Sequence, residues 1–134
     1  MKTTEHTEST EGILAPLTRE VIGCAIEVHR SLGPGLLEST YKRCLAHELK
    51  LATIETRIEV PVPVSYKGVL LDCGYRIDLL VNECLVVELK AVEQFSSVHE
   101  AQILTYMKLA EAPVGLLINF NVKLLKHGIR RFAL

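Results

Sequence analysis

The segment GYRIDLLVNECLVVELK, from Gly74 to Lys90, decides how this chain can fold. It holds two aliphatic runs of the kind typical of β-strands, separated by a short polar turn. Charged side chains interrupt these runs at Asp78, Glu88 and Lys90. Because charge is costly inside such strands unless it is paired or binds a metal ion, the three residues are candidates for a functional site.

The turn between the two runs determines whether the three charges meet. Glu88 and Lys90 lie two residues apart, so on a strand they share one face. A two-residue turn would leave Asp78 on the opposite face from Glu88, whereas a three-residue turn over 82–84 pairs them directly. A site made from both carboxylates therefore requires an odd-numbered turn or a bulge.

The three side chains have complementary chemistry if they meet. Asp78 and Glu88 would bind Mg²⁺ or Mn²⁺, with the Leu89 carbonyl as a further oxygen ligand. Lys90 would orient a metal-activated water or stabilise the oxygens of a reacting phosphate, which predicts phosphodiester hydrolysis. The alternative is a solvated face on which Arg76 and these residues form cross-strand ion pairs.

The rest of the chain predicts one mixed α/β domain over residues 16–134, after a disordered polar tail over residues 1–15. Apolar periodicity and the positions of glycine and proline give the order α-α-β-β-β-α-β. The expected elements are a helix from Thr18 to the break at Ser31–Gly35, a helix over 36–51, strands over 58–64, 69–81 and 84–91, a helix over 97–110 and a buried strand over 114–120, with a further short strand or extended tail over 123–134.

Two local patterns refine this prediction. The first strand contains Pro61 and Pro63, which places it at the edge of a sheet. The third helix is predicted to open with a capping box over Ser97–Glu100.

The composition favours a globular protein that lacks the strong positive electric field of proteins that coat nucleic acid. Of 134 residues, 49% are hydrophobic, and fifteen basic against sixteen acidic side chains leave a net charge of -1, which still permits a local basic groove. Trp is absent and aromatic residues make up 5%, which argues against a base-stacking platform.

The four cysteines form no C-x-x-C pair, which indicates free thiols in a reducing compartment. With no signal peptide or membrane span apparent, a cytoplasmic protein is expected.

Two predicted helices add polar pairs at four-residue spacing. Glu38 and Lys42 begin the second helix, where the alternative is a surface ion pair whose acid complements the helix dipole. Gln102 and Tyr106 lie on the third helix and, taken alone, would be an ordinary helix flank.

Basic residues gather near the C-terminus, among them Lys123 and Arg130. They are candidates for phosphate contacts. The alternative is that they only offset the acidic N-terminus.

Taken together, these residues resemble the PD-(D/E)xK nuclease superfamily. The similarity is to a small bacterial group, the GxxExxxR proteins, and extends from about Leu17 to the C-terminus. Residues Gly35–Glu38 match the start of the naming motif, and Lys42 stands where the motif has arginine. This difference keeps the charge and loses the planar fork of a guanidinium group.

The resemblance implies a restriction-endonuclease-like α-β-β-β-α-β core, in which helices flank a mixed central sheet. It implies that Asp78 is the metal-binding acid, that Glu88-Leu89-Lys90 is the acid-x-lysine motif and that Glu38 is the early helix glutamate. Residues Gln102–Tyr106 match the QxxxY motif of the RecB-like branch.

We therefore expect a Mg²⁺- or Mn²⁺-dependent nuclease that acts on DNA. Its catalytic residues would be Asp78, Glu88, Lys90, Gln102 and Tyr106, and its metal ligands Glu38, Asp78, Glu88 and Leu89. The side chains expected to contact the substrate are Lys42, Gln102, Lys123 and Arg130. A homodimer is expected if so small a core is to embrace a duplex.

Two other functions fit the same residues. The first is a catalytically silent nuclease-fold module that binds nucleic acid or a protein partner, which the near-neutral charge and the lack of a recognition domain favour. The second is a purely structural dimerisation domain, in which an apolar face would cover the carboxylates.

Overall fold

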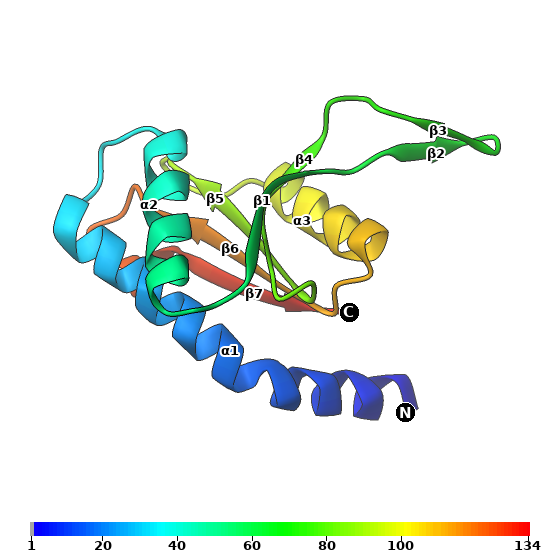
Figure 1. The fold of residues 1–134 in the computed structure, drawn as a ribbon, viewed down its shortest axis with the longest axis horizontal. Coiled ribbons are helices and arrows are strands. Elements are labelled where there is room, and N and C mark those ends of the chain that lie inside the picture. Colours follow the sequence, from blue (N-terminus) through cyan, green and yellow to red (C-terminus); the bar gives the residue numbers. More distant parts are fainter. Residues whose placement is uncertain (1) are drawn as a thin grey trace.

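The computed structural model describes residues 2–134, with side chains from Leu14 onward. Within this range the helices are α1 (Lys2–Leu32), α2 (Glu38–Leu51) and α3 (Ser97–Ala110), together with a short 3-10 helix, η1 (Leu125–Gly128). The strands are β1 (Thr56–Pro61), β2 (Val64–Tyr66), β3 (Val69–Leu71), β4 (Arg76–Val81), β5 (Leu85–Lys90), β6 (Val114–Asn119) and β7 (Ile129–Ala133). Figure 1 shows their arrangement.

A five-stranded sheet in the order β1-β4-β5-β6-β7 forms the centre of the molecule. β5 and β6 are parallel, and the other three pairs are antiparallel. The predicted mixed sheet flanked by helices is confirmed. β1 lies at the edge, as predicted, but it ends at Pro61, so Pro63 lies beyond it and the predicted strand over 58–64 is wrong at its end. A proline suits an edge strand because it has no N–H to give to a second neighbour.

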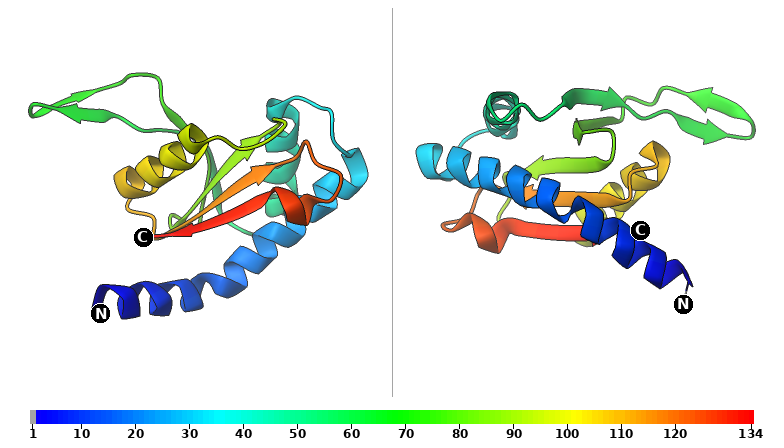
Figure 2. Two further views of the ribbon diagram at one scale, coloured as in Figure 1. Left: turned by 180° about the vertical axis from the view of Figure 1, so that it is seen from behind. Right: turned by 60° about the horizontal axis from the view of Figure 1, so that its bottom comes forward.

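Helices cover both faces of this sheet (Figure 2). Each face has its own apolar core. α1 and α2 cover a core that includes Val21, Ala25, Tyr41, Leu45, Leu79 and Val87. α3 covers a core that includes Ile77, Leu80, Val86, Ile103 and Met107. Because both faces are covered, β6 is buried along its whole length, as its continuous apolar run predicted.

A β-hairpin, which we call the arm (residues 62–75), projects from the core (Figure 1). It holds β2 and β3, which form a separate two-stranded sheet around the predicted turn at Lys67 and Gly68. The prediction of one strand over 69–81 is wrong, because the chain breaks between β3 and β4. Gly74 lies in that break with φ of +83°, a backbone conformation that favours glycine.

The junction between α1 and α2 fixes the first turn of α2. Gly35 has φ of +100°, which residues with a side chain rarely adopt. The Tyr41 hydroxyl donates to the Gly33 carbonyl oxygen at 2.6 Å and accepts from Leu36 N at 3.1 Å. The Tyr41 ring also stacks on Phe120 at 4.5 Å between centroids. These contacts hold the start of α2 near the C-terminal end of β6.

The start of α1 differs from the prediction. α1 begins at Lys2, whereas apolar periodicity predicted a start at Thr18. The predicted disordered tail over residues 1–15 falls almost wholly on residues whose side chains lie outside the described range, so it stays a prediction. Among residues 2–134, no helix combines the length and the apolar character that crossing a membrane requires.

The capping box of α3 is displaced by one residue from the predicted Ser97–Glu100. The N-cap is Ser96, whose Oγ accepts from His99 N at 3.4 Å, while His99 Nδ1 accepts from Ser96 N at 3.1 Å. An imidazole nitrogen thus closes the box, which a search for glutamate at this position could not find.

We expect Gly128→Ala to lower the free energy of unfolding by about 2 kcal/mol. An added Cβ would contact the backbone carbonyl oxygen of Asn119, so the backbone itself must shift. Gly23→Ala is the matched control, because its Cβ would meet no atom within 4 Å and it replaces a glycine inside α1. It should stabilise the protein by up to about 1 kcal/mol. Urea unfolding measures both, and equal stabilities would contradict the close approach of η1 to β6.

Candidate functional site

The turn between β4 and β5 brings the two strand carboxylates together. Val81 pairs with Leu85, so the turn contains the three residues 82–84 and meets the condition that a site made from both carboxylates requires. The same register sets Asp78 opposite Glu88. The two carboxylates therefore lie on one face, which a two-residue turn would not allow.

Two hydrogen bonds from backbone N–H groups to the Asp78 and Glu88 carboxylates take the place of the next ladder pair. The ladder of β4 and β5 ends at Leu79 and Val87. Beyond that pair, Asp78 N donates to Glu88 Oε2 at 2.7 Å, and Leu89 N donates to Asp78 Oδ2 at 2.9 Å. Each carboxylate thus accepts a backbone N–H of the opposite strand, which fixes the position of both groups.

Glu88 is almost completely buried, with 4% of its surface exposed. Burial, and after it the neighbouring Asp78 carboxylate, raise the pKa of Glu88 to about 8. The Asp78 N–H and the ammonium groups of Lys90 and Lys42 oppose this rise only in part. Without a metal, Glu88 is therefore mostly protonated at pH 7, and a bound cation would release that proton.

Lys42 reaches from α2 to two acidic side chains. Its Nζ lies 3.0 Å from Glu59 Oε2 and 3.5 Å from Asp78 Oδ1. Burial disfavours the ammonium form, but Glu59 and Asp78 outweigh burial and raise the pKa of Lys42. The structure thus places Lys42, which we predicted to contact the substrate, against acids of the site itself.

Glu59 is a site residue that the sequence did not reveal. It lies opposite Asp78, where the ladder between β1 and β4 is interrupted, and has φ of +53°. This left-handed conformation is unfavourable for a residue with a side chain and tends to persist where surrounding contacts require it. In the sequence, Glu59 was one polar position of an alternating strand, and alternation predicts no such local reversal.

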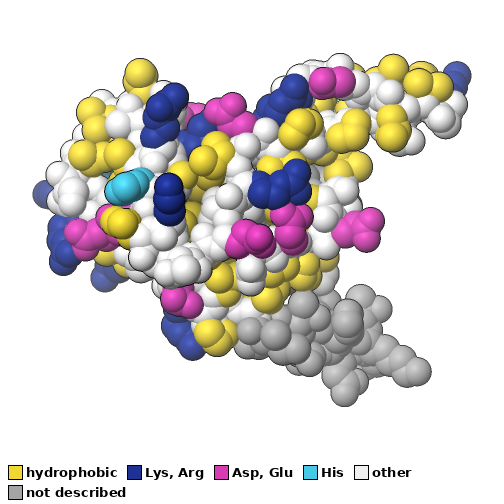
Figure 3. Space-filling view, viewed as in Figure 1, with side chains coloured by type: hydrophobic (Ala, Val, Ile, Leu, Met, Phe, Trp, Pro, Cys, Tyr) yellow, Lys and Arg dark blue, Asp and Glu magenta, His cyan; other side chains and the backbone are white. Residues whose placement is uncertain are grey.

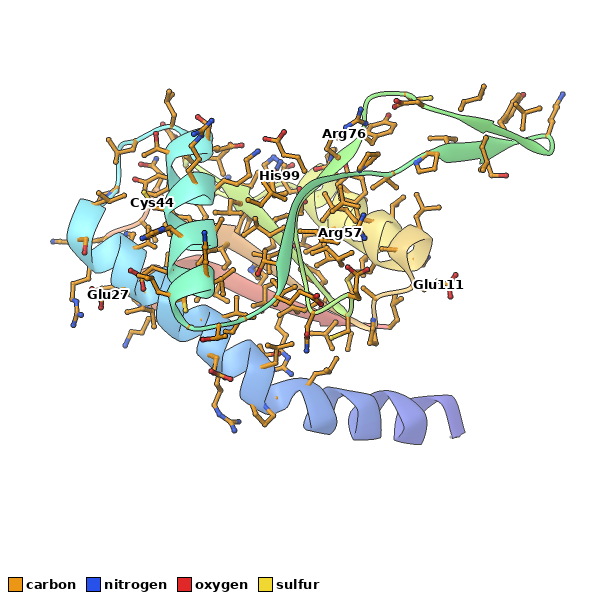
Figure 4. All side chains as sticks on the ribbon, in the orientation of Figure 1. Glu27, Cys44, Arg57, Arg76, His99 and Glu111 are labelled. Carbon is orange, nitrogen blue, oxygen red and sulfur yellow. The ribbon has the colours of Figure 1, made fainter. Side chains whose placement is uncertain are left out.

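α3 supplies Gln102 and Tyr106 to the same region, and Figure 4 shows side chains filling the space between α2, the sheet and α3. Lys90 Nζ donates to Gln102 Oε1 at 3.5 Å, and Gln102 Nε2 donates to the Tyr106 hydroxyl at 3.2 Å. Tyr106 is buried, and burial followed by the charges of Glu88 and Asp78 raises its pKa. The predicted helix pair is therefore connected to Lys90.

Glu38 lies at the margin of the site. It is exposed on the first turn of α2, and its Oε2 accepts from Ala91 N at 3.2 Å, next to Lys90. In the part of the chain that the structure describes, no three His, Cys, Asp or Glu side chains are grouped to hold a metal ion. Asp78 and Glu88 thus form a pair, and Glu38 as a third ligand stays a prediction.

Asn119 is a second residue that sequence reasoning missed. It pairs in register with Lys90 and is 3% exposed. Its Oδ1 accepts from Val92 N at 3.1 Å, and its Nδ2 donates to Val92 O at 2.8 Å. This buried amide holds the chain where it leaves β5, just after Lys90. The available signal was a polar residue at the end of an otherwise apolar run.

Lys123 and Arg130, which we predicted to contact the substrate, lie against other parts of the molecule. Arg130 Nη1 donates to Glu100 Oε2 at 2.7 Å, and its guanidinium group lies 5.5 Å from the centre of the Phe95 ring. Lys123 follows β6 and lines a hollow beside Pro34. Among the described residues neither cation contacts the paired carboxylates, so their part in substrate binding stays a prediction.

In metal-free protein we expect Glu88 to make the free energy of unfolding fall as pH rises. Its folded-state pKa of about 8 exceeds the ordinary value of 4.5, so between these values the folded protein retains a proton that the unfolded chain has lost. The contribution of Glu88 falls by at most about 1.4 kcal/mol per pH unit. Glu88→Gln should remove this component when both proteins are unfolded in urea with EDTA across the window. Parallel pH profiles would contradict the shift.

The chain matches a family model described as the PD-(D/E)XK nuclease superfamily over residues 15–132. No match is found among curated proteins or among solved structures. The matched range includes the strands that carry Asp78 and Glu88 and both helices that reach them. The five-stranded mixed sheet with flanking helices is consistent with a restriction-endonuclease-like fold. This chain belongs to the PD-(D/E)XK nuclease superfamily.

Proposed function

We propose that this protein is a Mg²⁺- or Mn²⁺-dependent nuclease that hydrolyses phosphodiester bonds of DNA. The observation that carries the proposal is the pair of hydrogen bonds that holds Asp78 and Glu88 on one face, at the strand end that carries Lys90. Membership of a nuclease superfamily whose enzymes generally use divalent metals supports it.

The donor set fits a hard divalent cation. Mg²⁺ usually binds one or two carboxylates and keeps several waters, so Asp78 and Glu88 suffice, with the Leu89 carbonyl as a further candidate. The carboxylates of the site region are Glu38, Glu59, Asp78 and Glu88, and the ammonium groups are Lys42 and Lys90. Once Glu88 has lost its proton, four negative and two positive formal charges leave -2, which one divalent cation would balance.

Such a cation would lower the pKa of a bound water and neutralise charge on the reacting phosphate. The protein's own side chains would bind and orient the phosphate and the attacking water. The Lys90 ammonium would donate to phosphate oxygens or to the attacking water, and Gln102 would hold Lys90 in place. Tyr106 keeps its proton and fixes Gln102 from the core side. Lys123 and Arg130 are proposed to contact flanking phosphates.

Within the superfamily we place this chain with the GxxExxxR proteins. Residues Gly35–Glu38 support this placement, together with the basic residue Lys42 at the final position of the motif. The hydrogen bond between Gln102 and Tyr106 supports a RecB-like QxxxY motif.

Lys90→Ala should lower DNA cleavage about 10²- to 10³-fold, because it removes the positive charge beside the reacting phosphate. Lys108→Ala is the control, since it removes an exposed lysine from α3, and should cleave like the wild type. Gel assays with Mg²⁺ or Mn²⁺ on single-stranded DNA, duplex DNA and RNA give the comparison. If the wild type equals Lys90→Ala on every substrate, the catalytic proposal is overturned.

One observation favours a second function, a catalytically silent module that binds nucleic acid or a protein partner. The Lys42 ammonium lies 3.5 Å from Asp78 Oδ1, so Asp78 already has a positive partner without a metal.

Calorimetric titration with Mn²⁺ separates the two functions. The nuclease should bind Mn²⁺, and Asp78→Asn should weaken binding at least tenfold, because it removes one of the two charged ligands. The Asp72→Asn variant, which changes an exposed acid on the arm, should bind like the wild type. Absence of binding at millimolar Mn²⁺ would favour the silent module.

A further inference from the structure

A groove of about 440 Å³ opens between the root of the arm and α3. The arm contributes Val62 and Tyr75, and α3 contributes Ala101 and Leu109. Figure 3 shows apolar side chains gathered along the arm and at its root. The volume of the groove lies in the range of pockets that hold small organic groups.

The groove is continuous with the candidate site, because Gln102 and Tyr106 belong to both. Gln102 accepts from Lys90 on one side and lines the groove on the other. A phosphodiester held at Lys90 carries a nucleoside on each side. The groove therefore adjoins the position at which such a phosphodiester would lie.

The walls of the groove suit a base and not a phosphate, which needs charged or N–H donors. The Tyr75 ring is half-exposed and meets the buried Tyr106 ring edge to face, with centroids 6.4 Å apart. An aromatic ring held in this way offers a stacking surface to a base. Gln102 and Thr105 add hydrogen-bonding atoms to the apolar lining, as recognition of a base edge requires.

We propose that this groove binds one unpaired nucleobase beside the reacting phosphate, so that single-stranded or frayed DNA is the preferred substrate. In a duplex the base is stacked and paired, and must leave the helix before it can enter such a pocket. The composition argues against a platform for successive bases, but a single base needs only Tyr75 and its support. The proposal rests on the proposed nuclease function for the identity of the ligand.

The test uses the full chain and a single-stranded oligonucleotide that carries 2-aminopurine, with Ca²⁺ in place of Mg²⁺. Binding should change the fluorescence of the base analogue. Tyr75→Ala should bind about tenfold more weakly, because one stacking contact is lost, and Tyr75→Phe should bind like the wild type. Tyr66→Ala is the matched control, since Tyr66 is an exposed tyrosine of the arm outside the groove.

The outcomes separate this proposal from the nuclease proposal. Equal binding by Tyr75→Ala and Tyr66→Ala, or binding of blunt duplex as tight as that of the single strand, would overturn the base pocket. A fluorescence change that depends on Tyr75 without cleavage in Mg²⁺ would uphold the pocket and reject the nuclease. Dissociation of a dimer by Tyr75→Ala would show that a second copy fills the groove, and would also overturn the proposal.

Discussion

The site depends on two hydrogen bonds across β4 and β5, from Asp78 N to the Glu88 carboxylate and from Leu89 N to the Asp78 carboxylate. A regular antiparallel ladder would pair these backbone groups with carbonyls and leave two carboxylates to be buried without donors. Here each carboxylate accepts the N–H that the ladder no longer uses, so a glutamate with 4% exposure is tolerated in the central sheet. The three-residue turn makes this possible, although Asn82 and Glu83 both adopt left-handed φ values there.

At Asp78 the side chains of β4 also change from one face of the sheet to the other. Leu79 packs in the core under α1 and α2, whereas Ile77, two residues away, packs in the core under α3. A regular strand would place both on one face, so β4 turns over at Asp78. Glu59, in a left-handed conformation on the facing strand, marks the matching irregularity in β1. β1 and β4 continue into the arm. The irregularity of β4 at Asp78 therefore also directs the arm, and with it Tyr75, over α3.

Much of this architecture followed from local patterns in the sequence. Alternation placed Glu88 and Lys90 on one face, and four-residue spacing joined Gln102 to Tyr106, because both relations are set within one element. The pairing of Asp78 with Glu88 could be stated only as a condition, since turn length is a property of two strands together. Relations between distant segments were not predictable in the same way, because Glu59 pairs with Lys42 of α2 and Asn119 bonds to a loop 27 residues away.

The partners of Lys42 bear on whether a cation can enter this site. A lysine whose one acidic partner was Asp78 would compete directly with a metal, because losing that partner would leave the charge of a side chain that is 17% exposed without a partner. Lys42 instead lies closer to Glu59, at 3.0 Å, than to Asp78, at 3.5 Å. It can therefore yield Asp78 to a cation and remain paired. On this argument the unfavourable backbone of Glu59 is retained because it supplies the second acid, and the contact between Lys42 and Asp78 is compatible with a metal-dependent nuclease.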